Sequence, residues 1–529
     1  MKHKIITHSV LTGLALIMSL ILISGCGSPK ASDQSSGSDG PVRGGTLNIG
    51  LHLPLPTLDW QSSVSHPLPM VFGHVYEGLF GFGRDFTAAP DLVDSYEVSE
   101  DGKRWTFVIR EGVTFHNGDL LDSEDVKASL DRWHRIGPKG SGLASLDGIE
   151  TPDSQTVVMN FNAPMGQFLL LLLGSDENKA IVMPKEVAEA STRPGQVTEV
   201  IGTGPYRFDE YKEDQYVRLK RFDAYSARSD NPNYQAGKKE AHVDEILFWI
   251  VPEASTRVAG LESGEYEIIT EVPDAEAIRL RDIDDVDPVK NGPGVLLYLM
   301  FNHQQGLTSD INIRRAFQAM VDPSEITAMV VSDSSFGKTY SSIYSPESAF
   351  NSSNEPSPSQ SAEAYLNEAG YNGEPLFIQV IATDIVQQRV AVALVEQAKR
   401  VGLNLQIQSY DLSTWVARRR DASVMNMYSS AGYWVDPSLW QPEFNGTFPS
   451  KEVGFSNAAA DELFANLASA TSLEERKVLA GELQAHFFKE VALVNLGYIY
   501  RLVAKGNTVH DPHGNLALGN LTLHGVWID

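Results

Sequence analysis

Residues 105–126 read WTFVIREGVTFHNGDLLDSEDV, and this stretch shows the pattern that decides the fold. Apolar and polar residues alternate from Trp105 to Ile109, which predicts a half-buried β-strand. The pair Asn117-Gly118 predicts a tight turn, and Asp122 or Ser123 can cap the helix that follows it. Strand and helix signals continue to alternate along the chain, so the sequence predicts an α/β protein.

The same kinds of signal mark other segments. Helical spacing of apolar residues predicts helices around Ile313–Met320 and Val390–Ala398. Alternation predicts strands at Gly45–Leu51 and Leu403–Ile407, and Ser472–Glu475 has the spacing of a capping box. No short-period internal repeat is present, so a solenoid or propeller is not expected.

Length, composition and charge limit the classes of protein that fit. The chain has 529 residues, 42% hydrophobic and 21% charged, which is ordinary globular composition. The length is too great for one simple core and suits two or three lobes. Asp and Glu number 68 against 42 Lys and Arg, which gives a formal net charge of −26. So acidic a surface repels phosphate backbones, and nucleic acid is not an expected partner.

The N-terminus has the features of a secretory signal. Lys2 and Lys4 precede the apolar run Val10–Ile23, which is too short for a stable transmembrane span. Residues 1–25 are therefore predicted to be a cleaved signal peptide. The junction before Cys26, the single cysteine of the chain, resembles the bacterial lipobox.

A lipobox implies that Cys26 is diacylated and anchors the protein, because two acyl chains hold a protein on a membrane where one is marginal. The alternative is a free cysteine at the end of an ordinary signal. Residues 26–42 are rich in Ser, Gly, Asp and Pro and are predicted to be a flexible tether. We expect a monomeric body outside the cytoplasmic membrane, on a Gram-positive cell surface or on the periplasmic side.

No catalytic signature is recognisable in the sequence. It lacks a G-x-S-x-G elbow, an H-E-x-x-H zinc motif, a Walker A loop and a C-x-x-C pair. The 13 histidines are scattered, and their spacing does not direct two rings toward one metal ion. We expect no enzymatic activity, no cofactor and no metal. A secreted hydrolase that uses two carboxylates is the alternative from a different class.

A succession of short blocks carries more information than any single motif. The blocks are Gly44–Leu47, Val75–Leu79, Ser95–Gly102, Phe107–Gly118, Gly202–Phe208, Ile313–Asp322, Glu368–Tyr371 and Val435–Pro437. In this order they resemble the family 5 extracellular solute-binding proteins of bacterial ABC importers, the dipeptide, oligopeptide and nickel-binding group. The resemblance extends from Arg43 to the C-terminus.

The resemblance implies a type II periplasmic-binding-protein fold, with two lobes around a hinge and an extra third domain. It also implies binding without chemistry, with ABC permease transmembrane subunits as partners; a receptor that only signals is a further alternative. The implied boundaries are 43–73 for the first segment of lobe I, 74–202 for the extra domain, 203–288 for the second segment of lobe I, 289–500 for lobe II and 501–529 for the last segment of lobe I.

The most informative stretch for the ligand is 429–437, SSAGYWVDP. Peptide binders of the family usually carry an aspartate at the position of Tyr433, where it pairs with the α-ammonium group of the peptide. Tyr433 and Trp434 instead offer flat faces with a polar edge, and either core packing or ligand contact explains them. Asp436 is a second candidate, although a turn role explains it better. Trp415 and Trp440 are expected to be core residues.

Three further candidates lie at the end of the first predicted helix. Arg132, Trp133 and Arg135 resemble the place where nickel-chelate binders hold carboxylates with arginine. A solvated basic helix end is the equal alternative. His66, in the loop after the first strand, is a weaker candidate. We expect a peptide or small-molecule ligand: an oligopeptide first, then an oligosaccharide or opine-like compound, then a metal chelate.

Overall fold

The computed structural model of the chain describes four stretches, residues 40–173, 178–352, 358–437 and 454–529. Val42–Asp529 forms one compact unit, and four hydrophobic core clusters lie within it. The predictions for Cys26 and Trp440 fall on residues outside the described stretches. Among the described residues, no helix combines the length and apolar character needed to cross a bilayer.

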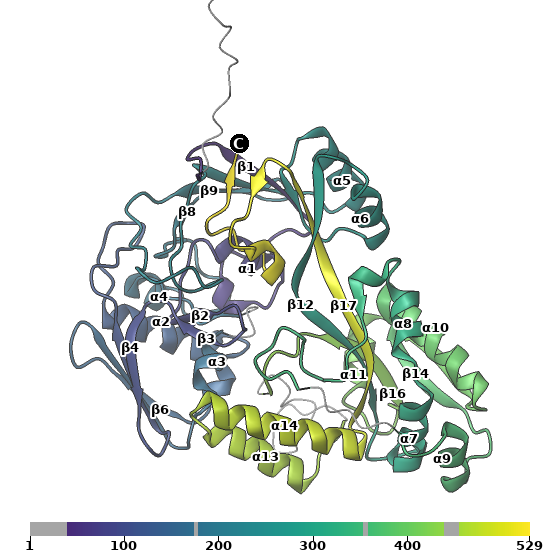
Figure 1. Ribbon diagram of the computed structural model, residues 1–529. Helices are drawn as coiled ribbons and strands as arrows, with labels where there is room; N and C mark the ends of the chain where they lie inside the picture. Colours follow the sequence, from purple (N-terminus) through teal and green to yellow (C-terminus); the bar gives the residue numbers. More distant parts are fainter. Residues whose placement is uncertain (1–39, 174–177, 353–357, 438–453) are drawn as a thin grey trace, which may run out of the picture. The chain divides into compact units, whose positions relative to one another are not determined.

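One mixed sheet of eleven strands organises the compact unit (Figure 1). Its strand order is β15-β14-β16-β12-β17-β11-β1-β10-β9-β8, and β13 pairs separately with β17. The strands are β1 (Thr46–Leu51), β8 (Tyr206–Lys212), β9 (Tyr216–Arg221), β10 (Glu245–Ile250), β11 (Ile268–Ile269), β12 (Val286–Phe301), β13 (Gly337–Lys338), β14 (Leu376–Ile381), β15 (Leu405–Tyr410), β16 (Met427–Gly432) and β17 (Leu493–Gly506).

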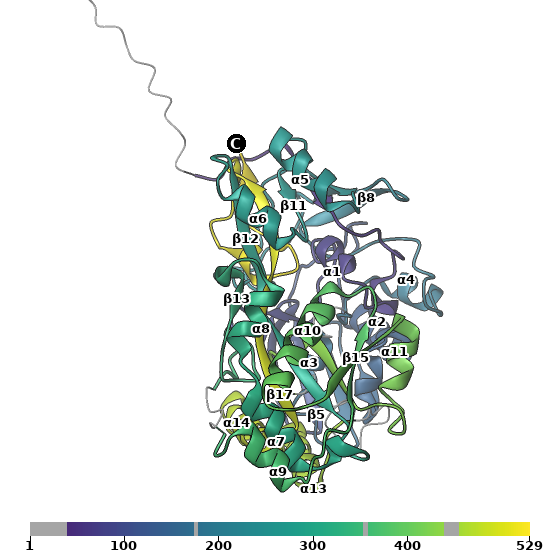
Figure 2. The same cartoon turned by 90° about the vertical axis from the view of Figure 1, so that its right-hand side faces the viewer.

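The long antiparallel strands β12 and β17 occupy the middle of this sheet, and Figure 2 shows them from the side. Their pairing is interrupted between Asn291 and Val295, where β12 contains Gly292-Pro293-Gly294. Proline has no N–H to donate, and Gly292 has a φ of 93°, so this segment cannot continue a regular ladder. The irregular segment lies beside the candidate site described below.

The N-terminal strand β1 is internal to the sheet. It runs parallel to both β10 and β11, and β11 in turn pairs antiparallel with β17. Segments from the beginning, middle and end of the chain therefore share one sheet. Two short pairs of strands lie outside this sheet, β2 (Phe80–Phe82) with β3 (Ala88–Pro90) and β18 (Val509–His510) with β19 (Trp527–Ile528).

A separate four-stranded sheet has the order β4-β5-β7-β6 and contains the stretch quoted first in the sequence analysis. The predicted strand is β5, the predicted turn has Gly118 at a φ of 92°, and Asp122 caps α2 through a complete capping box. These three predictions are confirmed. The strands are β4 (Val93–Val98), β5 (Arg104–Ile109), β6 (Leu146–Glu150) and β7 (Thr156–Phe161).

Helices cover the sheets and bury four core clusters against them. Helices α5 to α10 contribute to the cluster that includes β12, β14 and β17, whereas α13 and α14 pack with Trp415 and Trp434 in another. The helices are α1 (Pro67–Phe72), α2 (Ser123–Ile136), α3 (Phe168–Leu173), α4 (Lys185–Ala190), α5 (Ala254–Ser263), α6 (Asp274–Leu280), α7 (Ile311–Met320), α8 (Pro323–Val330), α9 (Ala362–Glu368), α10 (Ile385–Arg400), α11 (Leu412–Arg418), α13 (Ala458–Ser469) and α14 (Leu473–Glu490).

Candidate functional site

His52 and Glu271 follow two neighbouring parallel strands. β1 and β11 pair with Gly50 opposite Ile269, so their carboxyl ends meet at the same edge of the sheet. The backbone N–H of His52 donates to Thr270 Oγ1 at 3.1 Å, which ties the two strand ends together. Strand pairing thus places an imidazole and a carboxylate side by side from distant parts of the sequence.

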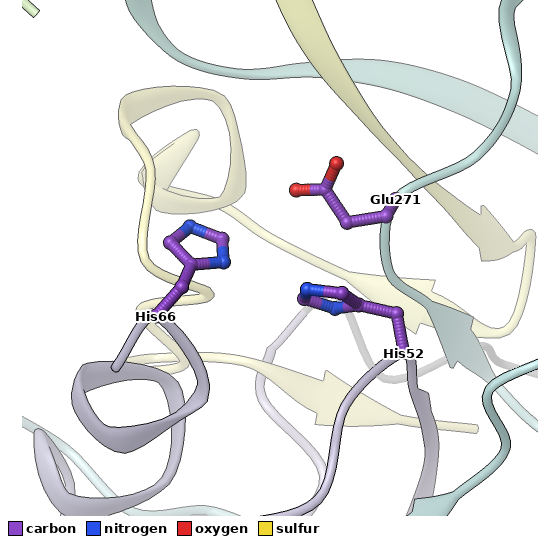
Figure 3. Close-up of side chains that lie close together, drawn as sticks. All are labelled: His52, His66 and Glu271. Carbon is purple, nitrogen blue, oxygen red and sulfur yellow. The ribbon is translucent and has the colours of Figure 1, made fainter. Parts of the chain in front are cut away.

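His66 completes this group from the loop that enters α1, of which it is the N-cap. Its ring centroid lies 5.5 Å from that of His52. One nitrogen of each imidazole and one carboxylate oxygen of Glu271 all lie within 4.8 Å of one another. Figure 3 shows the two rings and the carboxylate directed into the same space. We call His52, His66 and Glu271 the His-His-Glu cluster.

Arg501 links this cluster to the stretch that the sequence analysis favoured. Arg501 Nη1 donates to Glu271 Oε1 at 2.9 Å, and its guanidinium lies 5.8 Å from the ring centroid of Tyr433. A Cβ on Gly292 would lie 3.7 Å from Tyr433 Cε1, which places this part of β12 beside the ring. The structure thus brings two predicted site residues, His66 and Tyr433, to opposite ends of one charged group.

The backbone at Glu271 is held in an unusual conformation. Its φ is 49°, in the left-handed region that costs a residue with a Cβ about 1 kcal/mol or more. The buried Arg257 donates to the carbonyl oxygens of Thr270, Glu271, Val251 and Pro252 at 2.7–3.0 Å. Four carbonyls on one guanidinium fix the loop, and this fixed loop turns the Glu271 side chain toward the histidines.

The electrostatics of the cluster favour neutral imidazoles beside an ionised carboxylate. Burial is the main cause that lowers the pKa of His52 and of His66 to about 4, assisted by Arg501. Burial also raises the pKa of Glu271, but the positive charge and the hydrogen bond of Arg501 act against it, and the pKa lies below its usual value. At neutral pH both rings therefore have an unprotonated nitrogen.

A cavity of about 520 Å³ adjoins the cluster. Glu271 and Arg501 line it, together with Ser429–Ala431 at the end of β16 and Asp384–Gln387 at the start of α10. This volume is within the range of cavities that hold small molecules. The arrangement offers a solute both charge signs and an aromatic ring, with polar groups supplied by three strands.

The predicted residues Arg132 and Trp133 lie elsewhere, inside the domain built on the four-stranded sheet. Arg132 is 1% exposed and forms a two-pronged ion pair with Asp59, with Nη2 at 2.6 Å from Oδ2. Its Nε donates to the carbonyl of Ser191, and Trp133 Nε1 donates to Asn178. Protein partners account for both side chains, and contact with a ligand stays a prediction. The neighbouring Arg135 is exposed.

Two residues near Tyr433 also have protein partners. Trp434 is 4% exposed and packs 4.8 Å from the ring of Tyr298. Asp436 is buried, and both of its carboxylate oxygens accept from Arg476 at 3.1 Å. Protein partners account for Trp434 and Asp436, and contact of either residue with a ligand stays a prediction. Trp415 is buried, which confirms its prediction as a core residue.

The sequence analysis did not identify Glu271, Arg501 or His52 as site residues. Glu271 and Arg501 are 230 residues apart, and only the pairing of β11 with β17 brings them together. The one available signal was the position of His52 directly after a predicted strand. Histidine spacing, on which the expectation of no metal rested, is uninformative when the rings come from different segments.

Comparison with known proteins agrees with this architecture. Residues 87–451 match the family described as bacterial extracellular solute-binding proteins, family 5 middle. A probable peptide ABC transporter periplasmic-binding protein of Sinorhizobium fredii is 27% identical over 87% of this chain and 88% of the relative. Members of this family are solute-binding proteins of ABC importers and not enzymes, which removes the hydrolase alternative.

Two solved structures show the same fold. The binding protein AgaA of A. tumefaciens R10, in complex with agropinic acid, has a TM-score of 0.71 at 23% identity and covers 92% of this chain and 99% of its own. DppA of Helicobacter pylori, in complex with the peptide STSA, has a TM-score of 0.72 at 19% identity over 92% and 98%. The fold is that of the type II periplasmic binding proteins, and the chain belongs to family 5 of the bacterial extracellular solute-binding proteins.

Proposed function

We propose that this protein is the lipid-anchored receptor of an ABC importer and captures a peptide-sized polar solute, an oligopeptide first, for delivery to a permease. The observation that carries the proposal is the charged group in which Arg501 bridges Glu271 and Tyr433 beside the cavity. Buried and half-buried charges of this kind are usual where a site fixes the orientation of a charged ligand. The ligand-binding cleft would lie between lobe I and lobe II, and the two lobes would have the boundaries that the family resemblance implies.

The chemistry of the group supports a zwitterionic or anionic solute. The guanidinium of Arg501 suits a carboxylate, which it can bind with two parallel hydrogen bonds. Tyr433 stands where peptide binders usually have an aspartate, so the α-ammonium of a peptide would not find its usual partner there. An opine-like ligand is therefore the second candidate, and agropinic acid in the related structure of AgaA favours it. Oligosaccharide and metal chelate follow.

Native mass spectrometry of the chain from Gly40 onward tests the ligand class. We expect a bound adduct with the mass of a short peptide or an opine, lost on denaturation. Arg501→Gln should lower its occupancy about tenfold, because a charge-assisted hydrogen bond contributes roughly 1.5–3 kcal/mol. Tyr433→Ala should also lower it, through the loss of the aromatic face. Arg193→Gln, at an exposed arginine that does not line the cavity, is the matched control and should retain the adduct. Adducts spaced by a hexose would contradict the proposal, as would unchanged occupancy in both site variants.

The anchor is tested in living cells. In a bacterial host that processes lipoproteins, the full chain should incorporate labelled palmitate and remain in the membrane fraction. Cys26→Ser should lose the label, because serine has no thiol to acylate. If Cys26→Ser remains labelled and membrane-bound to the same extent, the anchor lies elsewhere.

A further inference from the structure

The His-His-Glu cluster has the composition of a transition-metal site. Two imidazole nitrogens and a carboxylate oxygen are the donors that bind Zn²⁺ and its neighbours in the first transition row, and His₂Glu is a common set for zinc. Mg²⁺ and Ca²⁺ prefer all-oxygen surroundings, so two imidazoles disfavour them. Among the residues that the structure describes, the three side chains of this cluster have donor atoms that all lie within 4.8 Å of one another.

We propose that His52, His66 and Glu271 bind one divalent first-row transition-metal ion, of the Zn²⁺ or Ni²⁺ class, at the carboxyl ends of β1 and β11. This inference does not depend on which solute the protein carries. The three side chains come from different segments and are directed into one space (Figure 3). Their donor atoms already lie within 4.8 Å of one another, and binding of an ion would draw them to the closer spacing of a coordination shell.

The hydrogen bonds around His52 prepare it as a ligand. Its Nδ1 lies 3.0 Å from Thr270 Oγ1, which also lies 3.2 Å from the carbonyl oxygen of Gly50. When the hydroxyl donates to Gly50, Nδ1–H of His52 donates to the hydroxyl, and Nε2 is left unprotonated. Metal-binding histidines characteristically donate their second nitrogen to such an outer partner, which fixes the ring and its tautomer.

His66 has a buried polar atom that the protein does not satisfy. Its Nδ1 is shielded from solvent and has no hydrogen-bond partner among the described residues. Burying a nitrogen without a partner is unfavourable, and a metal ion near the ring would offset that cost.

Glu271 is oriented by groups that a metal site also needs. Arg501 holds one carboxylate oxygen at 2.9 Å, which leaves the second oxygen on the other side of the carboxylate. Ligating carboxylates are commonly held by such outer hydrogen bonds. Three protein ligands leave a coordination position open, as in zinc sites that accept a further molecule. Because Glu271 also lines the cavity, a solute bound there would lie next to the ion.

Isothermal titration of the EDTA-dialysed chain from Gly40 onward, with Zn²⁺ and separately Ni²⁺, tests this site. We expect one ion per chain for at least one of the two, no binding of Mg²⁺, and a matching visible absorption when Co²⁺ is used. His52→Gln, His66→Gln and Glu271→Gln should each weaken the binding at least about tenfold. His510→Gln changes a histidine in the separate β18–β19 pair and should bind as the unchanged chain does.

Circular dichroism of each metal-free variant shows whether it is folded, so a loss of binding by a folded variant supports the site. The proposal is overturned if neither ion binds at about 100 μM, or if the ion binds equally well to all three variants. The titration uses no solute, so a failure here leaves the proposed solute unaffected. Equally, failure to find a peptide or opine adduct does not alter the metal result.

Discussion

At the scale of single residues, the side chain of Arg132 shows why a basic residue near a helix end is a weak indicator of a ligand site. Helical spacing places Arg132 on the same side of α2 as the buried Ser129, whereas Arg135 points to solvent. In the sequence, the two arginines differ only by three positions on the same predicted helix. The structure distinguishes them by Asp59, which comes from an unrelated loop and which no helical pattern could indicate.

The Arg132–Asp59 pair leads to a prediction about stability. Arg132→Met should lower the free energy of unfolding by about 3–5 kcal/mol, because it leaves the buried Asp59 carboxylate without its partner. Arg135→Met should change it by less than about 0.5 kcal/mol. Urea denaturation followed by tryptophan fluorescence measures both. Adding Asp59→Asn to Arg132→Met should recover part of the loss, and equal effects of the two arginine variants would show that the pair is unimportant.

At the scale of helices and strands, the sequence predicted local elements well and long strands poorly. The predicted helices are α7 and α10, the strands β1 and β15 follow their alternation, and Ser472 caps α14 by accepting from the N–H of Glu475. Each of these signals is local. The strand β12 was not predicted, because Pro288 and Gly292-Pro293-Gly294 interrupt its pattern and its pairing with β17 is distant in the sequence.

The pairing of β12 with β17 shifts register between Leu297 and Tyr298, and this irregularity, next to Gly497 of β17, gives a prediction at this scale. Gly497 has a φ of 110°, and a Cβ there would lie 2.5 Å from Thr327 Cγ2 on α8. Gly497→Ala should therefore destabilise the protein by about 1–3 kcal/mol through overpacking and backbone strain. Gly506→Ala, at the end of the same strand, is the control, since a Cβ there has no neighbour closer than 3.6 Å. Thermal unfolding compares them, and similar melting temperatures for the two variants would contradict this account.

At the scale of the whole molecule, the sheet order could not be read from the sequence, and the site depends on it. The family resemblance identified the fold class, and it directed attention to Tyr433. It did not indicate that β11 lies between β1 and β17, which is the arrangement that gathers Glu271, His52 and Arg501. Residues that meet through strand order have no common spacing, so only the folded chain reveals them.

Acid stability is a property of the whole molecule, and buried histidines govern part of it. Burial lowers the pKa of His74 to about 4, and the nearby Lys239 contributes to the same shift. An unfolded chain takes up that proton near pH 6.5, so the stability that a neutral His74 provides is complete above pH 6.5 and is lost as the pH falls toward 4. The loss amounts to about 3 kcal/mol at pH 4.

Replacing His74 should flatten this dependence. In urea denaturation at several pH values between 7.5 and 4, His74→Gln should show a shallower fall in unfolding free energy than the unchanged chain. Glutamine can still donate to the carbonyl of Leu521, which His74 Nε2 contacts at 3.2 Å. His510→Gln, at a half-buried histidine in the separate β18–β19 pair, should keep the original slope. If the His74 variant keeps it too, other groups govern the acid sensitivity.

The internal position of β1 also determines when folding can finish. The core around β1 includes Val503, Val509 and Val526, which lie in and after β17, far from β1 along the chain. Contacts between the two ends of a chain close slowly, because the whole intervening loop must be ordered first. This core therefore stays incomplete until the segments between β1 and β17 have been ordered, and its closure belongs to the late steps of folding.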